Sequence, residues 1–121
     1  MKLINDFYQI ISKESCEGEY RCKVQMNPDH ALYRVHFPGN PVTPGVCLVQ
    51  MATEILEQKY QKTLQLCKAD NIKFKKTVGS NEAPSFVFIK ELVEGNQLSV
   101  RVSIEDSEVQ FVKMSLRYNV A

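Results

Sequence analysis

The sequence has 121 residues and a formal net charge of +1, with 44% hydrophobic and 24% charged residues. This length and composition are typical of a single globular domain spanning residues 1–121, and the near-zero charge favours neither nucleic acid nor an anionic membrane as a partner. Because no apolar run approaches the roughly 18 residues that cross a bilayer and the first residues lack a signal-peptide pattern, we expect a cytoplasmic protein.

The first predicted elements are two β-strands, over residues 7–14 and 19–26, joined by a turn at the sequence CEGE. Alternation in the second strand places one set of side chains on the core face: Tyr20, Cys22, Val24 and Met26. A long helix is predicted next, with Thr43 as its N-cap, Pro44 in its first position and an end near Cys67. Its first half is apolar on nearly every side and should be buried, whereas its second half is amphipathic.

Further strands are predicted after the helix, separated by turn sequences such as EGN and EDSE: residues 71–78, 85–93, 97–105 and 109–118. Their alternating apolar residues should face the core: Ile72, Phe74 and Val78, then Leu98, Val100, Val102 and Ile104, then Val112, Met114, Leu116 and Tyr118. The most economical arrangement of these elements is an α+β fold, in which a six-stranded antiparallel sheet wraps around one long central helix.

The cysteines and histidines give no sign of a metal site. Cys16, Cys22, Cys47 and Cys67 form no CxxC pair, and the chain has only 2 histidines, whereas a structural zinc site needs four closely spaced ligands. Cys16 and Cys22 could face each other across the first hairpin, but free thiols are the expected state in a reducing cytosol. Cys47 should pack as a small apolar side chain.

The most distinctive stretch is HFPGNPVTPGV, residues 36–46, at the start of the predicted helix. Its prolines restrict the backbone of the loop, and Gly39 and Gly45 permit close approach of another group. A rigid loop with a purely structural role would have the same composition.

The same stretch also holds groups that suit a reaction. At the helix start the backbone N–H groups of Gly45 and Val46 lack intrahelical acceptors, and such groups can polarise a carbonyl oxygen. His36 can accept a proton near neutral pH. Together these groups suit removal of a proton next to a carbonyl, and the residues alone leave the structural and the catalytic interpretation open.

This stretch resembles the signature His-Phe-Pro-Gly-x-Pro-x-x-Pro-Gly-Val of the hotdog-fold 3-hydroxyacyl-acyl carrier protein dehydratases. The residues that match it in register are His36, Phe37, Pro38, Gly39, Pro41, Pro44, Gly45 and Val46. The flanks resemble the family more loosely, because Val35 stands where glycine is usual and Lys73 where arginine is usual. The resemblance covers nearly the whole chain and implies a hotdog fold and a dimer whose sheets join edge to edge.

The resemblance also implies dehydration of a 3-hydroxyacyl thioester, in fatty acid or polyketide-type biosynthesis. His36 would take the α-proton, and a backbone N–H at Gly45 or Val46 would hold the thioester oxygen. A carboxylate from the partner subunit's central helix would protonate the departing hydroxyl. The substrate would be carried on the phosphopantetheine of acyl carrier protein, with no other cofactor, and these signature residues would shape the loop: Phe37, Pro38, Gly39, Pro41 and Pro44.

The chain departs from the family at the position of the acid, five residues after Gly45, which is occupied by Gln50. An amide can hydrogen-bond a hydroxyl but cannot give it a proton, and a positioned acid contributes roughly 10²- to 10⁴-fold to a rate. Glu54 is the nearest carboxylate on the same helical face. It is either a substitute acid or a glutamate with a solvated or packing role.

Three functions therefore stay open. A dehydratase could act as a homodimer through Glu54 or water, or pair with a second hotdog chain that supplies the acid. A thioesterase could use Gln50 and Thr53 to orient a water molecule. A non-catalytic subunit would only bind an acyl chain or a carrier protein.

Two polar features complete the sequence. Lys68, Lys73, Lys75 and Lys76 form a basic cluster after the predicted helix; acyl carrier proteins are acidic, so the cluster could be a docking patch, although a solvated strand face has the same composition. His30, beside Asp29 in a predicted turn, should cap the turn or face solvent rather than act in catalysis.

Overall fold

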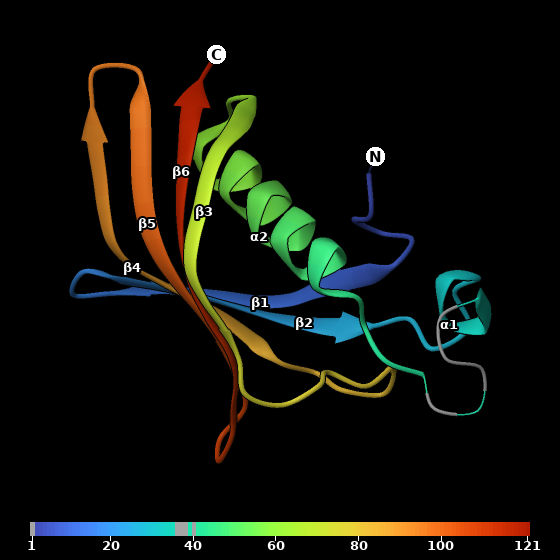
Figure 1. Ribbon diagram of the computed structural model, residues 1–121. Coiled ribbons are helices and arrows are strands. Elements are labelled where there is room, and N and C mark those ends of the chain that lie inside the picture. Colours follow the sequence, from blue (N-terminus) through green and yellow to red (C-terminus); the bar gives the residue numbers. More distant parts are fainter. Residues whose placement is uncertain (1, 36–38, 40) are drawn as a thin grey trace.

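The computed structural model describes residues 2–35, 39 and 41–121. Its elements follow in the order β1 (Tyr8–Cys16), β2 (Glu19–Met26), α1 (Leu32–Val35), α2 (Gly45–Tyr60), β3 (Leu64–Phe74), β4 (Ser85–Glu94), β5 (Gln97–Glu105) and β6 (Gln110–Val120). The strands form one antiparallel sheet in the order β1-β2-β4-β5-β6-β3, and α2 lies against one of its faces (Figure 1). The expected α+β fold, a six-stranded antiparallel sheet around one long helix, is confirmed.

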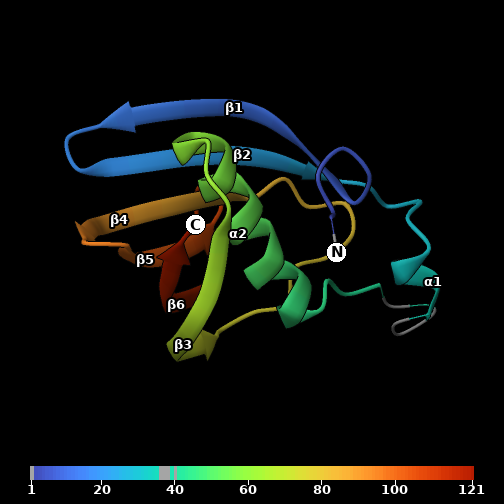
Figure 2. The same cartoon turned by 90° about the horizontal axis from the view of Figure 1, so that it is seen from above.

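The sheet curves around α2, so that the helix lies inside the curve (Figure 2). The alternation of β5 and β6 puts the expected residues on this inner face, where all are buried: Leu98, Val100, Val102, Ile104, Val112, Met114, Leu116 and Tyr118. They pack with the apolar side of α2, which buries Cys47, Leu48, Met51, Ala52, Ile55 and Leu56. The intervening strand residues point the other way, onto what we call the outer face.

The helix is shorter than the sequence predicts and ends at Tyr60 rather than near Cys67. Gln61 takes a left-handed conformation with φ 54° and ψ 42°. At the turn back, the Leu64 N–H donates a hydrogen bond of 2.9 Å to Glu57 Oε2. The predicted helix is wrong only beyond Tyr60, because the segment from Leu64 pairs with β6 as an edge strand. This pairing outweighs a weak helical preference.

The helix start also differs from the prediction, because Pro44 and not Thr43 is the N-cap residue. The buried Thr43 hydroxyl lies 2.8 Å from the Tyr33 hydroxyl, and the Thr43 N–H donates to the Val78 carbonyl at 2.8 Å. Thr43 therefore fixes the chain just before α2 to two other segments instead of capping the helix.

Residues 71–78 do not form one strand, but their predicted core face is confirmed for Ile72, which packs against the core, and for Val78, which is buried. A bulge between Asp70 and Lys73 interrupts the pairing of β3 with β6 and shifts the alternation of side chains. After the bulge Phe74 lies opposite the buried Val112 of β6 and so is on the expected inner face, but it is 59% exposed because β3 is the edge strand of the sheet.

A short helix, α1, was not predicted, and His30 caps its start. His30 Nδ1 accepts a hydrogen bond of 3.1 Å from the Leu32 N–H, and Nε2 lies 3.1 Å from Asp6 Oδ2. The expected capping role of His30 is confirmed. Neither helix α1 nor α2, within the described ranges, is long and apolar enough to cross a membrane.

The cysteines are free thiols. Cys16 pairs with Glu19 and Cys22 with Lys13 in the first hairpin, so the two cysteines do not face each other. Cys47 is buried in the core, as expected. Among the residues that the structure describes, no group of three or more His, Cys, Asp or Glu side chains could hold a metal ion.

Candidate active site

The candidate site is built around the first turn of α2, where an extended Pro44 (φ −62°, ψ 144°) leads into Gly45. The Pro44 carbonyl accepts hydrogen bonds from the N–H groups of Cys47 at 3.0 Å and Leu48 at 3.2 Å. The N–H groups of Gly45 and Val46 precede these bonds, at the end of the helix where the peptide dipoles concentrate positive charge. Since neither N–H donates a hydrogen bond within the described part of the chain, both can polarise a bound oxygen.

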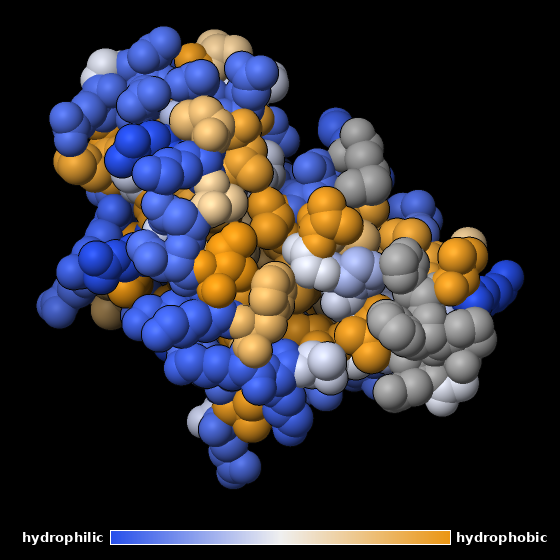
Figure 3. Space-filling view, in the orientation of Figure 1, coloured by the Kyte–Doolittle hydropathy of each residue, from blue (hydrophilic) through white to orange (hydrophobic). Residues whose placement is uncertain are grey.

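The ring of Phe74 covers this helix start. A Cβ atom added to Gly45 would lie 2.8 Å from Phe74 Cζ, so the close approach of the ring requires glycine at this position. Figure 3 shows hydrophobic side chains gathered between β3 and the start of α2. Phe74 of β3 and Val46 of α2 are 59% and 70% exposed. Phe74 therefore forms an open apolar wall beside the two N–H groups. Sequence reasoning missed this role, because simple alternation could not reveal the bulge in β3.

The loop before the helix is held at its end. Val42 forms an isolated antiparallel bridge with Gly79, and Pro41 is exposed. Gly39 has a φ of 91°, a left-handed conformation that favours glycine. Three expected site residues lie outside the described residues, and their roles stay predictions: His36, Phe37 and Pro38.

One turn along α2 from Val46, the half-buried Gln50 donates a hydrogen bond of 2.9 Å from Nε2 to Glu54 Oε2. Glu54 is only 4% exposed. Its other donors come from the N-terminal segment: Leu3 N and Ile4 N, both at 2.8 Å, and Tyr8 OH at 3.0 Å. We call this convergence of donors on one carboxylate the Glu54 clasp.

The Glu54 clasp gives this carboxylate a packing role. Among the described residues, no lysine or arginine forms an ion pair with Glu54, so N–H and O–H donors alone compensate its burial. Burial and then the charge of Glu54 raise the pKa of Tyr8, which keeps the Tyr8 hydroxyl a donor. The hydrogen bonds of Glu54 therefore tie the start of the chain to the middle of α2.

Thr53, the other polar residue expected to orient a water, is buried at 7% exposure. Its hydroxyl donates to the Val49 carbonyl at 3.0 Å and also lies 3.0 Å from the Tyr118 hydroxyl. The structure thus brings Gln50 together with Glu54 but not with Thr53, whose hydroxyl bonds to core partners.

Comparison with known proteins identifies relatives of this chain. Residues 12–114 match the ApeI-like family, described as ApeI dehydratase. The chain is similar to the 3-hydroxyacyl-[acyl-carrier-protein] dehydratase FabZ of Lactobacillus helveticus, with 39% identity over 64% of this chain and 61% of that protein. The match therefore spans less than two thirds of the length of this curated relative.

Solved structures share the fold at low sequence identity. The dehydratase heterocomplex ApeI:P from Xenorhabdus doucetiae has a TM-score of 0.73 at 14% identity, covering 91% of this chain and 96% of that one. A hypothetical thioesterase with coenzyme A from Streptococcus pneumoniae has a TM-score of 0.68 at 14% identity, covering 98% and 91%. The signature that ends in the first turn of α2, the curved sheet around one helix and the family match lead to one conclusion: the chain belongs to the ApeI-like family of hotdog-fold dehydratases.

Proposed function

We propose that this chain is the histidine-bearing subunit of a dehydratase that acts on 3-hydroxyacyl thioesters of acyl carrier protein. His36 would take the α-proton, and the N–H groups of Gly45 and Val46 would stabilise the negative charge that develops on the thioester oxygen. The resulting enolate would expel the 3-hydroxyl as water when an acid protonates it. The observation that carries the proposal is the first turn of α2, where the N–H groups of Gly45 and Val46, the last two residues of the family signature, donate no hydrogen bond within the described part of the chain.

The acid would come from a second hotdog chain. Gln50 has no proton to give, and the oxygens of Glu54 already accept from the N-terminal segment and from Gln50. A structural neighbour is a dehydratase heterocomplex, ApeI:P. In a homodimer of this chain both sites would lack the acid. In a mixed pair, His36 would meet the partner's carboxylate, and one site of the two would be complete.

Pairing would use the free edge of β3. This strand ends the sheet, and its unpaired backbone groups can extend a sheet in a partner chain. Exposed apolar side chains beside the edge, including Leu66 and Phe74, would be covered by such pairing. We expect the chain alone to form a homodimer through this edge. Sedimentation that shows a stable monomer at micromolar concentration would rule this out.

Mass spectrometry of a 3-hydroxyacyl carrier protein tests the proposed reaction, because dehydration lowers the mass by one water. We expect turnover when the chain is co-purified with a hotdog chain that carries a glutamate or aspartate at the position of Gln50. His36→Ala in this chain should lower that rate by roughly 10²- to 10⁴-fold. A variant complex with an unchanged circular dichroism spectrum and an unchanged rate would contradict the role of His36.

The same assay separates the alternatives. A thioesterase would release the carrier protein with a free thiol, but the Thr53 hydroxyl that would help to orient a water is already bonded to core groups. A subunit that only binds would leave the mass unchanged in every complex. Only the loss of one water supports a dehydratase.

A further inference from the structure

His30 lies just before α1, shortly ahead of His36 in the sequence, and the proposed reaction does not use it. Its side chain is only 16% exposed, and both ring nitrogens have a partner. Nδ1 accepts a hydrogen bond of 3.1 Å from the Leu32 N–H, and Nε2 lies 3.1 Å from Asp6 Oδ2. Because a backbone N–H can only donate, Nδ1 carries a lone pair and the ring proton is on Nε2, which donates to Asp6. These hydrogen bonds fit a neutral imidazole.

Protonation of His30 would break one of these bonds and keep the other. A second ring proton would lie on Nδ1 and point at the Leu32 N–H, and two donors cannot share a hydrogen bond. The bond to Asp6 would stay, because Nε2 keeps its proton. α1 has only 4 residues, and the first N–H groups of a helix have no acceptor within the helix. Loss of this cap therefore removes a large share of the bonds that hold α1.

The segment between α1 and α2, residues 36–44, is connected to α1 at both of its ends. At one end, Val35 is the last residue of α1 and directly precedes His36. At the other end, the Tyr33 hydroxyl of α1 lies 2.8 Å from the Thr43 hydroxyl. Tyr33 and Thr43 are both buried, and groups packed in a core do not move independently. A shift of α1 would therefore displace both ends of the segment that carries the family signature.

The ring of Phe7 fixes the orientation of the His30 ring. It meets the His30 ring edge-on at a centroid distance of 5.1 Å and stacks on the Tyr33 ring at 5.1 Å, with an interplanar angle of 20°. Phe7 is fully buried. The imidazole therefore cannot turn away from the Leu32 N–H without disturbing this stack.

We propose that His30 is a positioning residue for the proposed reaction: its neutral imidazole holds α1, and through α1 the start of α2, in the arrangement that the site needs. The inference rests on the proposed function, because the group that it positions is the proposed base, His36. Histidine is the side chain whose charge ordinarily changes between pH 5 and 8. Dehydration should therefore fall on the acid side of neutrality for two reasons, protonation of His36 itself and loss of the cap at α1.

The charged group in contact with the His30 ring is Asp6, from the segment before β1. Asp29 and Arg34 belong to the same stretch of chain as His30, where Arg34 Nη2 donates to the Asp29 carbonyl at 3.4 Å. Neither of these side chains forms an ion pair within the described ranges. Asp6 binds the ring in both charge states, whereas the Leu32 N–H binds only the neutral ring. The cap is therefore the contact that protonation removes.

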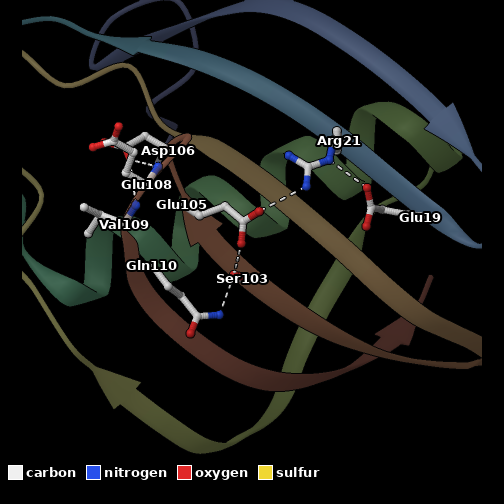
Figure 4. Close-up of polar contacts among 8 residues, drawn as sticks. All are labelled: Glu19, Arg21, Ser103, Glu105, Asp106, Glu108, Val109 and Gln110. Carbon is white, nitrogen blue, oxygen red and sulfur yellow. Dashed lines mark hydrogen bonds and ion pairs between the residues drawn. The ribbon is translucent and has the colours of Figure 1, made fainter.

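The charged network on the outer face does not change charge in this pH range. Figure 4 shows that network, in which Arg21 Nη2 lies 3.0 Å from Glu105 Oε1, and the turn beside it, where Asp106 accepts from the N–H groups of Glu108 and Val109. These two hydrogen bonds lower the pKa of Asp106, and carboxylates and guanidinium groups ordinarily titrate outside this range. The chain has only 2 histidines, so a variant without His36 isolates the titration of His30.

The first test follows His30 by NMR in the His36→Ala chain between pH 5 and 8. We expect the amide signals of Leu32 and Gly45 to titrate together with the His30 ring, because the cap opens and the shift reaches the start of α2. Adding His30→Asn should remove this response, since an asparagine oxygen caps a helix at any pH in this range. Amide signals of Leu32 and Gly45 that do not follow the ring would overturn the proposal, whether or not the chain is active.

The second test compares the dehydration rates of the mixed complex with wild type, His30→Asn and the matched variant His30→Gln, whose longer amide can still reach Asp6 but does not cap. From pH 7.5 to 5.5 the wild-type rate should fall roughly threefold further than that of His30→Asn, at the low end of what the loss of a cap costs. His30→Gln should be roughly threefold slower than His30→Asn already at pH 7.5.

Equal acid-side profiles of wild type and His30→Asn would overturn the positioning role. The absence of turnover by wild type at every pH would count against the proposed function, and the NMR titration would then decide the inference by itself.

Discussion

The polar groups on the two sides of the sheet differ in whether they have partners within the chain. On the inner side, the buried carboxylate of Glu54 receives hydrogen bonds from Leu3, Ile4, Tyr8 and Gln50. On the outer side, Lys73 lies opposite Lys113 and Lys68 opposite Arg117. Of these four cations, only Lys68 has an ion pair in the described part of the chain. The carboxylate beside α2 is therefore committed to structure, whereas the opposed cations of β3 and β6 remain exposed.

The difference explains why a carboxylate near the site is not evidence for an acid. Glu54 lies one turn from Gln50, close to the position that the family reserves for its proton donor. Its hydrogen bonds give it a structural role, because the groups that donate to it belong to the N-terminal segment and so tie that segment to α2. In this account the missing acid comes from another chain.

We expect the largest loss of stability when the hydrogen bonds of the Glu54 clasp are removed by Glu54→Ala. The change leaves buried donors without an acceptor, at about 1–3 kcal/mol for each group that water cannot reach, so we expect a loss of about 3 kcal/mol in the free energy of unfolding. Urea denaturation measures it, with Gln58→Ala on the exposed side of the same helix as a control that should change stability by less than about 0.5 kcal/mol. Equal stability of the two variants would show that the Glu54 clasp does not stabilise the fold.

A smaller effect is expected from Tyr8 at alkaline pH. Burial and the charge of Glu54 raise the pKa of Tyr8 in the folded chain, so its contribution is fully present below the unfolded pKa of about 10 and is lost as pH rises toward the folded value. Above pH 10 the wild type should therefore lose up to about 1.4 kcal/mol per pH unit more than Tyr8→Phe. The free energy of unfolding of both proteins is measured by urea denaturation between pH 9 and 11. An equal loss in the two proteins over this range would show that Tyr8 is not held in its neutral form.

The smallest expected effect is on the like-charge pair of Lys73 and Lys113 on the outer face. Lys113→Glu converts the pair with Lys73 from like to opposite charges, and we expect a gain of about 0.5 kcal/mol in the free energy of unfolding at low salt. The gain should shrink in 1 M salt, because the charges are exposed. A loss of stability at low salt would mean that the two lysines do not repel each other.

Much of this fold could be predicted from the sequence. The prediction succeeds for elements that have one side in water and the other in the core, because their apolar and polar residues then alternate. β2, β5 and β6 alternate cleanly, and the predicted inner residues such as Val24, Val102 and Met114 are buried. β3 could not be predicted in the same way, because it is an edge strand with bulges, and its pairing with β6 rather than its own pattern determines where α2 ends.

The candidate site also has features that the local sequence indicates and features that depend on distant residues. The local signature indicated the helix start to within one residue, since Pro44 and not Gly45 was predicted to be its first position, and the sequence showed the substitution at Gln50. The role of Glu54 was not predictable, because its N-terminal donors lie 46 to 51 residues away in the sequence. The covering of Gly45 by Phe74 depended on a bulge that no local pattern announces.

The most direct test of the central claim, that this chain lacks its own acid, is the dehydration rate of its homodimer with and without Gln50→Glu. The new side chain has nearly the shape of glutamine, so a carboxyl oxygen would lie near the present Nε2, 2.9 Å from Glu54 Oε2. Two carboxyls this close favour the protonated form, which a proton donor needs.

We predict that Gln50→Glu raises the rate by tenfold or more, a conservative share of the roughly 10²- to 10⁴-fold that a positioned acid can give. Glu54→Gln should leave any activity of the wild-type homodimer unchanged. If instead that activity disappears in Glu54→Gln and returns when Gln50→Glu is added to it, Glu54 is the acid and the account is contradicted.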